Sequence, residues 1–426
     1  VSERARLPPS LIRYSRRAQQ ELSPSEAEEP TQMAKKKTVR RTTTAASAEA
    51  SPEPAAEQVR LPAEELYADQ LEALRQNDTD TPPQAWKLSP RSVLKYVVGG
   101  APLAAKNTGK TAKVPITRKF FGDDGIVERA IVTIASERAL LLVGEPGTGK
   151  SWLSEHLAAA ISGTSTVTIQ GTAGTTEEHI KYSWNIARVI AEGPTPANMI
   201  PSPTMIAMRN GGVLRFEEVT RCVPDVQDSL VSILSDKAIS VPELPDHNTV
   251  WARPGFNVIA TANTRDQGVN ELSAALKRRF NYIHIPIVAD QKTEVDIIQQ
   301  RSTDLTERYN VPTTMTPSIV KLLATVFREL RNVKTNEGVS IKQPSSTVSS
   351  AEAIGVALDA ALHAQFFGTG KISAGDVARN LVGSLVKEDT ADLAILKEYA
   401  VVVARKRAAK NKEWGEFHDA LLESSK

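Results

Sequence analysis

The motif Gly144–Ser151 constrains the fold of this chain more than any other feature. Its sequence, GEPGTGKS, fits the pattern G-x-x-x-x-G-K-[ST] without a mismatch. The apolar run Ala139–Val143 precedes it, and the helix-forming segment Lys150–Ile161 follows it. A glycine-rich loop between a buried strand and a helix turns successive backbone N–H groups toward a phosphate, and the helix adds its positive end. The motif therefore predicts an α/β fold with a nucleotide phosphate site.

Each member of this loop has an expected role. The backbone would surround the phosphates of ATP, the Lys150 ammonium would contact the β- and γ-phosphates, and the Ser151 hydroxyl would bind Mg²⁺. The residues predicted to bind the nucleotide are Gly144, Glu145, Pro146, Gly147, Thr148, Gly149, Lys150 and Ser151.

Two carboxylates end a strand downstream of the loop. The segment Gly211–Glu218 reads GGVLRFEE, which predicts a short strand followed by two acids. Adjacent residues at a strand end point to different sides. We therefore assign Glu217 to the metal, together with Ser151. We assign Glu218 to the attacking water, which it would orient or deprotonate.

A third strand end carries a polar amide. The segment Val258–Thr264 is apolar at first and ends in small polar residues. Because it follows the other two motifs in order, we expect Asn263 to hydrogen-bond the γ-phosphate or to help hold the attacking water.

Strand and helix signals alternate through the middle of the chain. Strands are expected at 139–143, 166–170, 212–216, 256–262 and 282–287. Such alternation predicts a mainly parallel sheet sandwiched by helices, which we assign to residues 116–288. Later segments have helical signals throughout, so we expect an all-helical lid domain at 289–390 and a C-terminal helix and tail at 391–426.

The N-terminal part has a different composition. Residues 1–60 contain few residues able to form a core, so we expect a disordered tail, with Met33 a candidate start of the chain. Its basic stretch Lys35–Arg41 is typical of a solvated tail more than of a nucleic-acid arm. Apolar spacing and Pro90 predict a small helical appendage at 61–115, joined by a loose linker.

The overall composition excludes several classes of function. Lys and Arg total 52 against 50 Asp and Glu, so charge gives no argument for binding nucleic acid or a membrane. Cys222 is the single cysteine, which excludes an intrachain disulfide, and the six histidines have no metal-ligand spacing. No apolar run is long enough for membrane insertion. We expect a cytoplasmic protein.

Together these motifs resemble the MoxR branch of the AAA+ ATPases. The resemblance extends to Glu192–Pro194, to Val226–Leu230 and to Leu272–Phe280, and it covers residues 115–385. It implies a P-loop AAA+ core, and an ATP- and Mg²⁺-dependent ring, usually a hexamer, that remodels a protein client. It also implies a partner with a von Willebrand factor A domain and a helical insert within residues 175–192.

The resemblance also implies roles for single residues. Asn263 matches the first sensor, and Arg278 with Arg279 falls where an arginine finger is expected. Adjacent helical residues point about 100° apart, so we expect one of the two to reach a neighbour's nucleotide, and Arg279 is our choice. Arg221 matches a family arginine at the border between subunits. Phe121, with the two residues after it, matches a position that contributes to the adenine pocket.

Two positions depart from the family pattern. The first acid is Glu217 instead of Asp, and the lid stretch Pro344–Glu352 lacks the arginine that commonly acts as a second sensor. Either that role is absent, or Lys342 or Arg301 takes it over. Because this second-sensor arginine is absent, a nucleotide-regulated scaffold with little ATP turnover is an alternative function. A metal-chelatase-type motor subunit is a further alternative. A hairpin expected within Ile239–Pro254 would line the ring's pore or lie on the surface.

Overall fold

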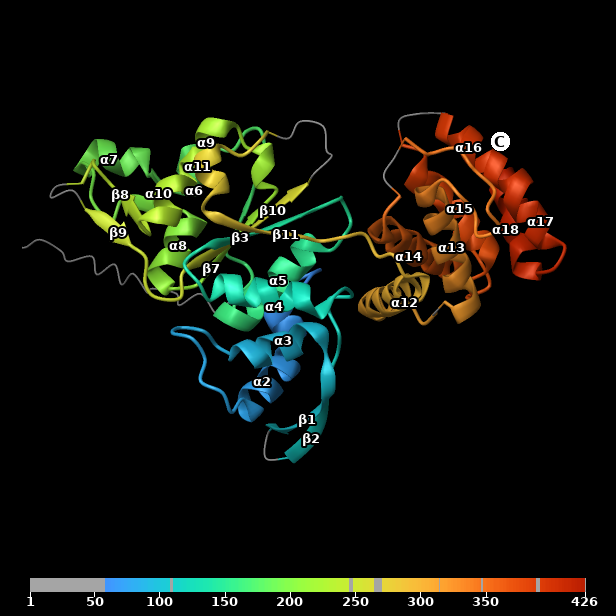
Figure 1. Cartoon of the computed structure of the whole chain (residues 1–426), viewed down its shortest axis with the longest axis horizontal. Helices are drawn as coiled ribbons and strands as arrows, with labels where there is room; N and C mark the ends of the chain where they lie inside the picture. The colour runs from blue at the N-terminus through green and yellow to red at the C-terminus, as the bar shows by residue number, and fades with distance from the viewer. Residues whose placement is uncertain are drawn as a thin grey trace, which may run out of the picture. The chain divides into compact units, whose positions relative to one another are not determined.

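In the computed structural model, a five-stranded sheet stands at the centre of the α/β core predicted at residues 116–288 (Figure 1). The strands are β3 (Ala139–Gly144), β4 (Thr168–Gln170), β7 (Val213–Glu217), β10 (Asn257–Asn263) and β11 (Phe280–His284). Their order is β11-β3-β10-β7-β4, and every pair is parallel. The predicted mainly parallel sheet is confirmed. This order puts the ends of β3, β10 and β7 side by side.

The structure describes residues 58–107, 110–244, 248–263, 270–313, 315–345, 348–387 and 391–425. Residues 59–426 form one unit by their contacts. The expected tail, including Met33 and the basic stretch after it, lies outside the described residues except at its last positions. None of the helices in the described ranges is long and apolar enough to cross a membrane.

Helices cover both faces of the sheet because its strands are apolar on both sides. Leu140 and Leu142 pack on one face with α4 (Asp124–Ile134) and α5 (Lys150–Ser162). Leu141 and Leu214 pack on the other face with α8 (Pro203–Asn210) and α10 (Leu230–Ser235). Residues of α6 (Glu177–Ile180), α9 (Pro224–Asp228) and α11 (Ala274–Lys277) also pack on this face, whereas α7 (Ile186–Glu192) has no buried residue. The expected sandwich is therefore present.

The N-terminal appendage differs from the expectation in two respects. It contains α1 (Ala63–Leu66), α2 (Ala68–Asn77) and α3 (Pro90–Val98), but also an antiparallel hairpin of β1 (Gly100–Asn107) and β2 (Lys110–Ile116). The prediction of a small helical appendage at 61–115 is therefore wrong for the residues of β1 and β2, whose backbone groups are satisfied by pairing between the two strands. The linker is not loose either, since Trp86 and Leu88 are buried and the Lys87 N–H donates to the Ile161 carbonyl.

Two short antiparallel pairs extend from the core. The strands β5 (Tyr182–Trp184) and β6 (Met199–Pro201) pair beside α6 and α7, which occupy the expected helical insert. The strands β8 (Ala238–Ser240) and β9 (Thr249–Trp251) form the hairpin expected within Ile239–Pro254. The tip of that hairpin, residues 245–247, lies outside the described residues.

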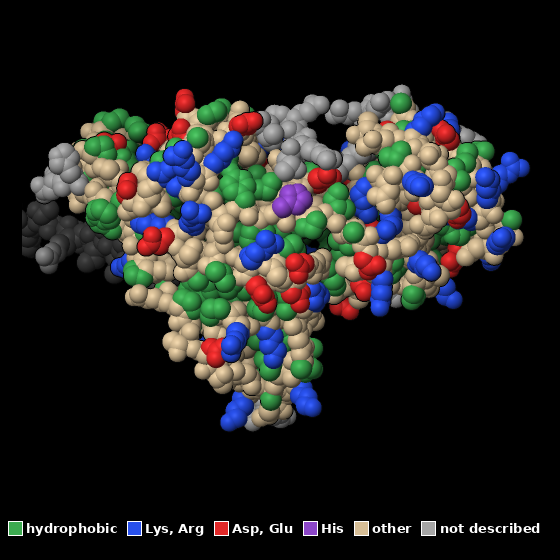
Figure 2. All heavy atoms as spheres, in the orientation of Figure 1, with side chains coloured by type: hydrophobic (Ala, Val, Ile, Leu, Met, Phe, Trp, Pro, Cys, Tyr) green, Lys and Arg blue, Asp and Glu red, His purple; other side chains and the backbone are tan. Residues whose placement is uncertain are grey.

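After the sheet the chain is helical and has its own apolar core. The helices are α12 (Gln291–Arg308), α13 (Pro317–Asn332), α14 (Ser350–Phe366), α15 (Ala374–Leu385), α16 (Ala391–Tyr399), α17 (Arg405–Ala408) and α18 (Lys412–Ser424), with a π-helical turn at Ala400–Ala404. Capping boxes at Ser349 and Ser373 start α14 and α15. On the face seen in Figure 2, basic and acidic side chains are interspersed, in keeping with the balanced composition.

Candidate active site

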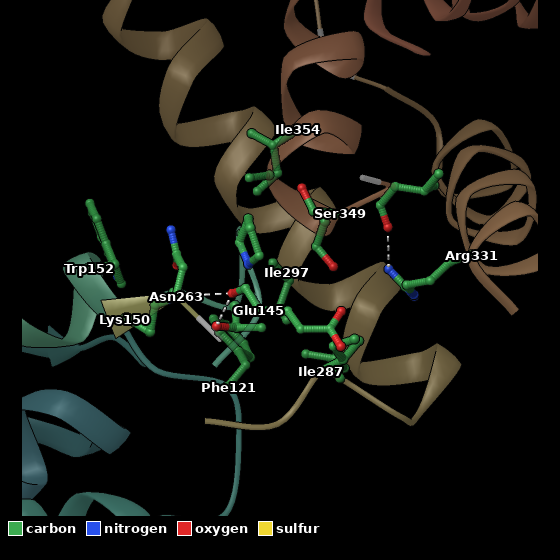
Figure 3. A pocket seen from close by; sticks show the side chains of 18 of the residues that line it. Phe121, Glu145, Lys150, Trp152, Asn263, Ile287, Ile297, Arg331, Ser349 and Ile354 are labelled. Carbon is green, nitrogen blue, oxygen red and sulfur yellow. Dashed lines mark hydrogen bonds between the residues drawn. The ribbon is translucent and has the colours of Figure 1, made fainter. Parts of the chain in front are cut away.

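A cavity of about 1010 Å³ lies where the phosphate loop meets the helical lid (Figure 3). Its core wall includes the loop from Glu145 to Ser151, together with Glu218, Thr261 and Asn263. Its lid wall includes side chains from α12, α13 and α14, and Ile287–Ala289 connects the two walls. The sheet order explains the core wall, because three neighbouring strands end at this edge.

The phosphate loop is shaped by glycines in the left-handed region. Gly147 has φ +75°, and a Cβ there would lie 2.5 Å from the Ser349 side chain at the start of α14. Gly149 has φ +85° and leads directly into α5, which has no side-chain N-cap in the structure. The Lys150 ammonium donates to the carbonyls of Gly144 and Glu145, at 3.1 and 2.7 Å. Loop backbone, helix end and ammonium therefore converge on one wall.

Glu217 is held by a dense set of donors. Its carboxylate accepts hydrogen bonds from Ser151 (2.7 Å), Ser154 (2.6 Å), Thr261 (2.7 Å) and the Arg215 guanidinium (2.8 Å). Burial alone would raise the pKa of this carboxyl, but Arg215 and the three hydroxyls outweigh burial, so the pKa is lowered. An ionised carboxylate thus lies against the Ser151 hydroxyl.

Glu218 follows with a different backbone. Its φ is +53°, in the left-handed region, and its N–H donates to the Thr261 hydroxyl at 2.9 Å. A Cβ at Gly171 would lie 2.4 Å from the Glu218 carbonyl oxygen, so only glycine allows this close approach. The Glu218 carboxylate is part-exposed, lines the cavity and forms an ion pair with Arg221. The turn sends the two neighbouring carboxylates in different directions.

Asn263 lies on the same wall because of the strand register. It ends β10 and pairs in register with Gly144, the first residue of the loop. Among the labelled side chains of Figure 3, Lys150, Trp152 and Asn263 lie on the core wall. Phe121 also lines the cavity, whereas Asp123 caps α4 by accepting from the Gly125 N–H.

The two candidate finger residues lie apart from their own chain's cavity. Arg278 is exposed at the end of α11, and neither it nor Arg279 is among the residues that line the cavity. The Arg279 guanidinium donates to the Ser235 hydroxyl and to the Ala275 carbonyl. The fold therefore separates these arginines from Lys150 and Glu218 within one chain.

The lid contributes three arginines to the cavity: Arg301 of α12, and Arg328 and Arg331 of α13. Arg331 donates twice to Glu294, at 2.8 Å each, and Arg328 donates to the Ala289 carbonyl at 2.6 Å. Lys342 instead pairs with Glu398, away from the cavity lining. Arg328 and Arg331 were not among the predicted site residues, because no local motif marks which face of an amphipathic helix will lie against the phosphate loop.

Comparison with known proteins agrees with this geometry. Residues 139–280 match the model of the AAA domain of the dynein-related subfamily, and residues 292–421 match the YehL-like AAA+ ATPase C-terminal domain. The uncharacterized protein YehL of Escherichia coli (strain K12) is 40% identical over 364 residues, which cover 85% of this chain and 96% of that protein. This chain belongs to the YehL-like AAA+ ATPases. Members of the AAA+ class bind nucleotide.

More distant similarities cover a smaller part of the chain. An uncharacterized protein of Staphylococcus haemolyticus is 27% identical over 180 residues, which cover 42% of this chain and 67% of the Staphylococcus protein. The solved structure of NtrX from Brucella abortus in complex with ADP aligns at a TM-score of 0.40 and 12% identity. That alignment covers 58% of this chain and about half, 51%, of NtrX.

Proposed function

We propose that this YehL-like chain is a Mg²⁺-dependent ATPase that forms a ring and remodels or activates a protein client. The observation that carries the proposal is the convergence of Lys150, Ser151 and Glu218 on one cavity, with the Glu217 carboxylate hydrogen-bonded to Ser151 directly behind its wall. A phosphate loop, an ionised carboxylate beside a hydroxyl, and a second carboxylate that faces the cavity are the parts that phosphoanhydride hydrolysis requires.

The chemistry of the donors fits magnesium. Mg²⁺ prefers oxygen ligands and is usually held by one or two carboxylates plus substrate phosphates. Ser151 and Glu217 supply such oxygens 2.7 Å apart, and the lowered pKa of Glu217 keeps it ionised. No group of three His, Cys, Asp or Glu side chains able to hold a metal occurs within the described ranges, so phosphates would complete the shell. Bound there, Mg²⁺ would neutralise charge that develops on the phosphates.

The remaining core residues divide the other tasks. Lys150, which now donates to loop carbonyls, would place its ammonium against the β- and γ-phosphates. Glu218 would orient the attacking water or accept its proton, and to do so its carboxylate must part from Arg221. Asn263, in register with the loop, would hold the γ-phosphate or the water.

A ring would complete the site. Arg278 and Arg279 do not line their own chain's cavity, so a finger from this position would serve a neighbouring subunit. A guanidinium at the γ-phosphate is worth about 10³–10⁵ in rate where it has been measured. Arg279 is our choice, and it would have to leave Ser235 and Ala275 to act. The hexamer rests on the MoxR resemblance.

The client and the partner rest on the same resemblance. The order of motifs and the segment Leu272–Phe280 support a MoxR-type role with a von Willebrand A-domain partner. The balanced charge of the chain favours a protein client over nucleic acid. With one cysteine in the whole sequence, a cytoplasmic location is part of the proposal.

The test is steady-state ATP hydrolysis against protein concentration. The native chain, Glu218→Gln and Arg279→Ala are compared, with the exposed Arg405→Ala as a matched control for loss of an arginine. We expect turnover per chain to rise with concentration, to collapse in the first two variants and to persist in the control. Arg278→Ala, run alongside, decides between the two candidate fingers. Native turnover that does not depend on Glu218 would sink the proposed motor.

One observation favours a second candidate, a scaffold that nucleotide assembles but that hydrolyses slowly. The stretch Pro344–Glu352 has no arginine, and Arg331 is bound twice by Glu294. The stretch in which a second sensor is expected therefore supplies no arginine, and Arg331 of the lid is held by a carboxylate of its own chain. In the same experiment a scaffold would show ATP-dependent assembly, measured by light scattering, with Glu218→Gln assembling and turning over as the native chain does.

A further inference from the structure

The first turn of α5 is connected to the lid through a tryptophan. Trp152 comes directly after Ser151 of the phosphate loop and lines the cavity. The guanidinium carbon of Arg301, on lid helix α12, lies 3.7 Å from the centre of its indole ring. Arg301 is the residue that the sequence offered as one candidate for a second sensor.

The indole is also bound by the segment between β2 and α4. Its Nε1–H donates to the Lys119 carbonyl at 2.9 Å. The neighbour of Arg301 makes a parallel contact, because the Gln300 side chain donates to the Arg118 carbonyl at 3.0 Å. Two consecutive lid residues therefore engage two consecutive residues of one segment, one of them through Trp152.

Trp152 also packs against an aromatic cluster formed by His156, Tyr67 and Tyr96. The Trp152 ring lies 4.4 Å from the ring of His156, which is buried and lies 5.2 Å from Tyr67 of the N-terminal appendage. The Lys119 ammonium is buried between the rings of Tyr67 and Tyr96, at 4.7 and 4.3 Å from their centres. Trp152 therefore contacts the core and the N-terminal appendage as well as Arg301, so the stack joins the lid to packed elements on the core side.

Two contacts hold the Arg301 guanidinium in this position, the stack on Trp152 and an ion pair with Asp304. Its side chain is 18% exposed, and Nη1 pairs with Asp304 at 3.1 Å, one turn along α12. A planar guanidinium over an indole, partly shielded from water, is the favourable form of a cation–π contact. A residue placed in this way holds two elements together, whereas a sensor must reach the phosphates.

We propose that the Arg301–Trp152 stack is a latch that holds the lid over the nucleotide, which makes both residues positioning residues for ATP binding. The inference rests on the proposed function only in that ATP occupies this cavity. The latch favours the lid position in which the cavity is complete. Apparent nucleotide affinity scales with the fraction of molecules in that state, so breaking the latch lowers affinity and leaves the chemical groups in place.

The test compares Arg301→Met, Arg301→Lys, Trp152→Leu and Trp152→Phe with the exposed control Arg405→Met. We measure KM and kcat for MgATP, and the dissociation constant of a fluorescent ADP. Loss of a shielded cation–π contact corresponds to a rise of about 5- to 30-fold in KM and in the dissociation constant. We expect kcat within about threefold of native. Trp152→Phe and Arg301→Lys, which keep a ring or a cation, should recover part of the affinity.

A spectroscopic signal separates this role from general stability. MgATP should change the part of the tryptophan emission that Trp152→Phe removes, and the change should be absent in Arg301→Met. The latch is wrong if Arg301→Met binds ADP as tightly as native, or if kcat falls while KM does not rise. Turnover missing from the native chain with ADP binding intact would overturn the motor only, since the binding arm still tests the latch.

Discussion

The two walls of the cavity hold their charges in different ways. On the core wall, Lys150 donates to the carbonyls of Gly144 and Glu145, and Glu217 behind it accepts from three hydroxyls as well as from Arg215. On the lid wall, Arg331 is paired twice with Glu294, whose side chain is fully buried, and Arg301 is stacked on an indole. The core wall therefore presents groups that phosphates and Mg²⁺ can engage. On the lid wall, the positive charge of Arg331 is already neutralised by Glu294 of the same chain.

The sharpest test of this difference replaces one buried carboxylate behind each wall, Glu217 next to Ser151 and Glu294 next to Arg331. Glu217→Gln removes a proposed metal ligand, so we expect turnover to fall by about 10²–10³-fold. Glu294→Gln removes the partner of Arg331, so we expect a loss of about 3–5 kcal/mol in the free energy of unfolding. Its turnover per folded chain should stay within about threefold of native. ATP hydrolysis and urea unfolding of both variants provide the check.

A matching loss of turnover in Glu294→Gln, with stability unchanged, would contradict the division between the walls. It would mean that the lid pair acts on the nucleotide.

The double variant Glu294→Met/Arg331→Met measures how much the Glu294–Arg331 ion pair contributes to the stability of the lid. Removing both charges avoids an unpaired buried ion, so most of the stability lost in Glu294→Gln should return, about 2–4 kcal/mol. Urea unfolding of the two single variants and the double variant gives the coupling energy. Additive losses would show that Glu294 and Arg331 stabilise the lid through separate contacts.

The contact between the walls can be broken at Gly147. A Cβ there must adopt φ +75° and lies 2.5 Å from Ser349 of α14, so Gly147→Ala should cost about 1–3 kcal/mol and raise KM for ATP. Gly383→Ala, on α15, is the control, since its Cβ would meet no atom within 4 Å and alanine favours a helix. Thermal unfolding and ATPase assays test both. Native-like behaviour of Gly147→Ala would show that the lid does not press on the loop.

The last expected effect concerns the buried ammonium of Lys119, which lies against the rings of Tyr67 and Tyr96. Burial lowers the pKa of Lys119 to about 7, against a partly opposing attraction from Asp304, while the unfolded chain keeps the ordinary value near 10.5. Between these values the unfolded state binds more protons, so the native stability rises with pH by up to about 1.4 kcal/mol per unit, and it is lost again as pH falls toward 7. Lys119→Met removes this slope.

Urea unfolding at pH 7, 8 and 9 measures the effect. The difference in stability between native and Lys119→Met should grow in favour of the native chain as pH rises. Lys412→Met, whose side chain is 92% exposed, should show no such trend. If the difference in the free energy of unfolding stays constant from pH 7 to 9, Lys119 does not titrate in this range in the folded chain.

Comparing expectation with structure shows which signals are local. The strand before the loop, the strand that ends in Glu217 and the strand that ends in Asn263 were predicted within one or two residues. Each combines a buried apolar run with a polar end, which is a property of consecutive residues. The hairpin of β1 and β2 was missed, because its residues satisfy their backbone by pairing and carry only a weak apolar alternation.

The phosphate loop, the paired acids and the α/β class could be predicted from the amino-acid sequence, because these signals depend on residues a few positions apart. The fold was needed to see that Gly144 and Asn263 stand in register, that Arg278 and Arg279 lie away from their own cavity, and that Arg301 rests on Trp152. Those contacts join positions far apart in the chain. Strand order and helix packing, which depend on the whole core, bring them together.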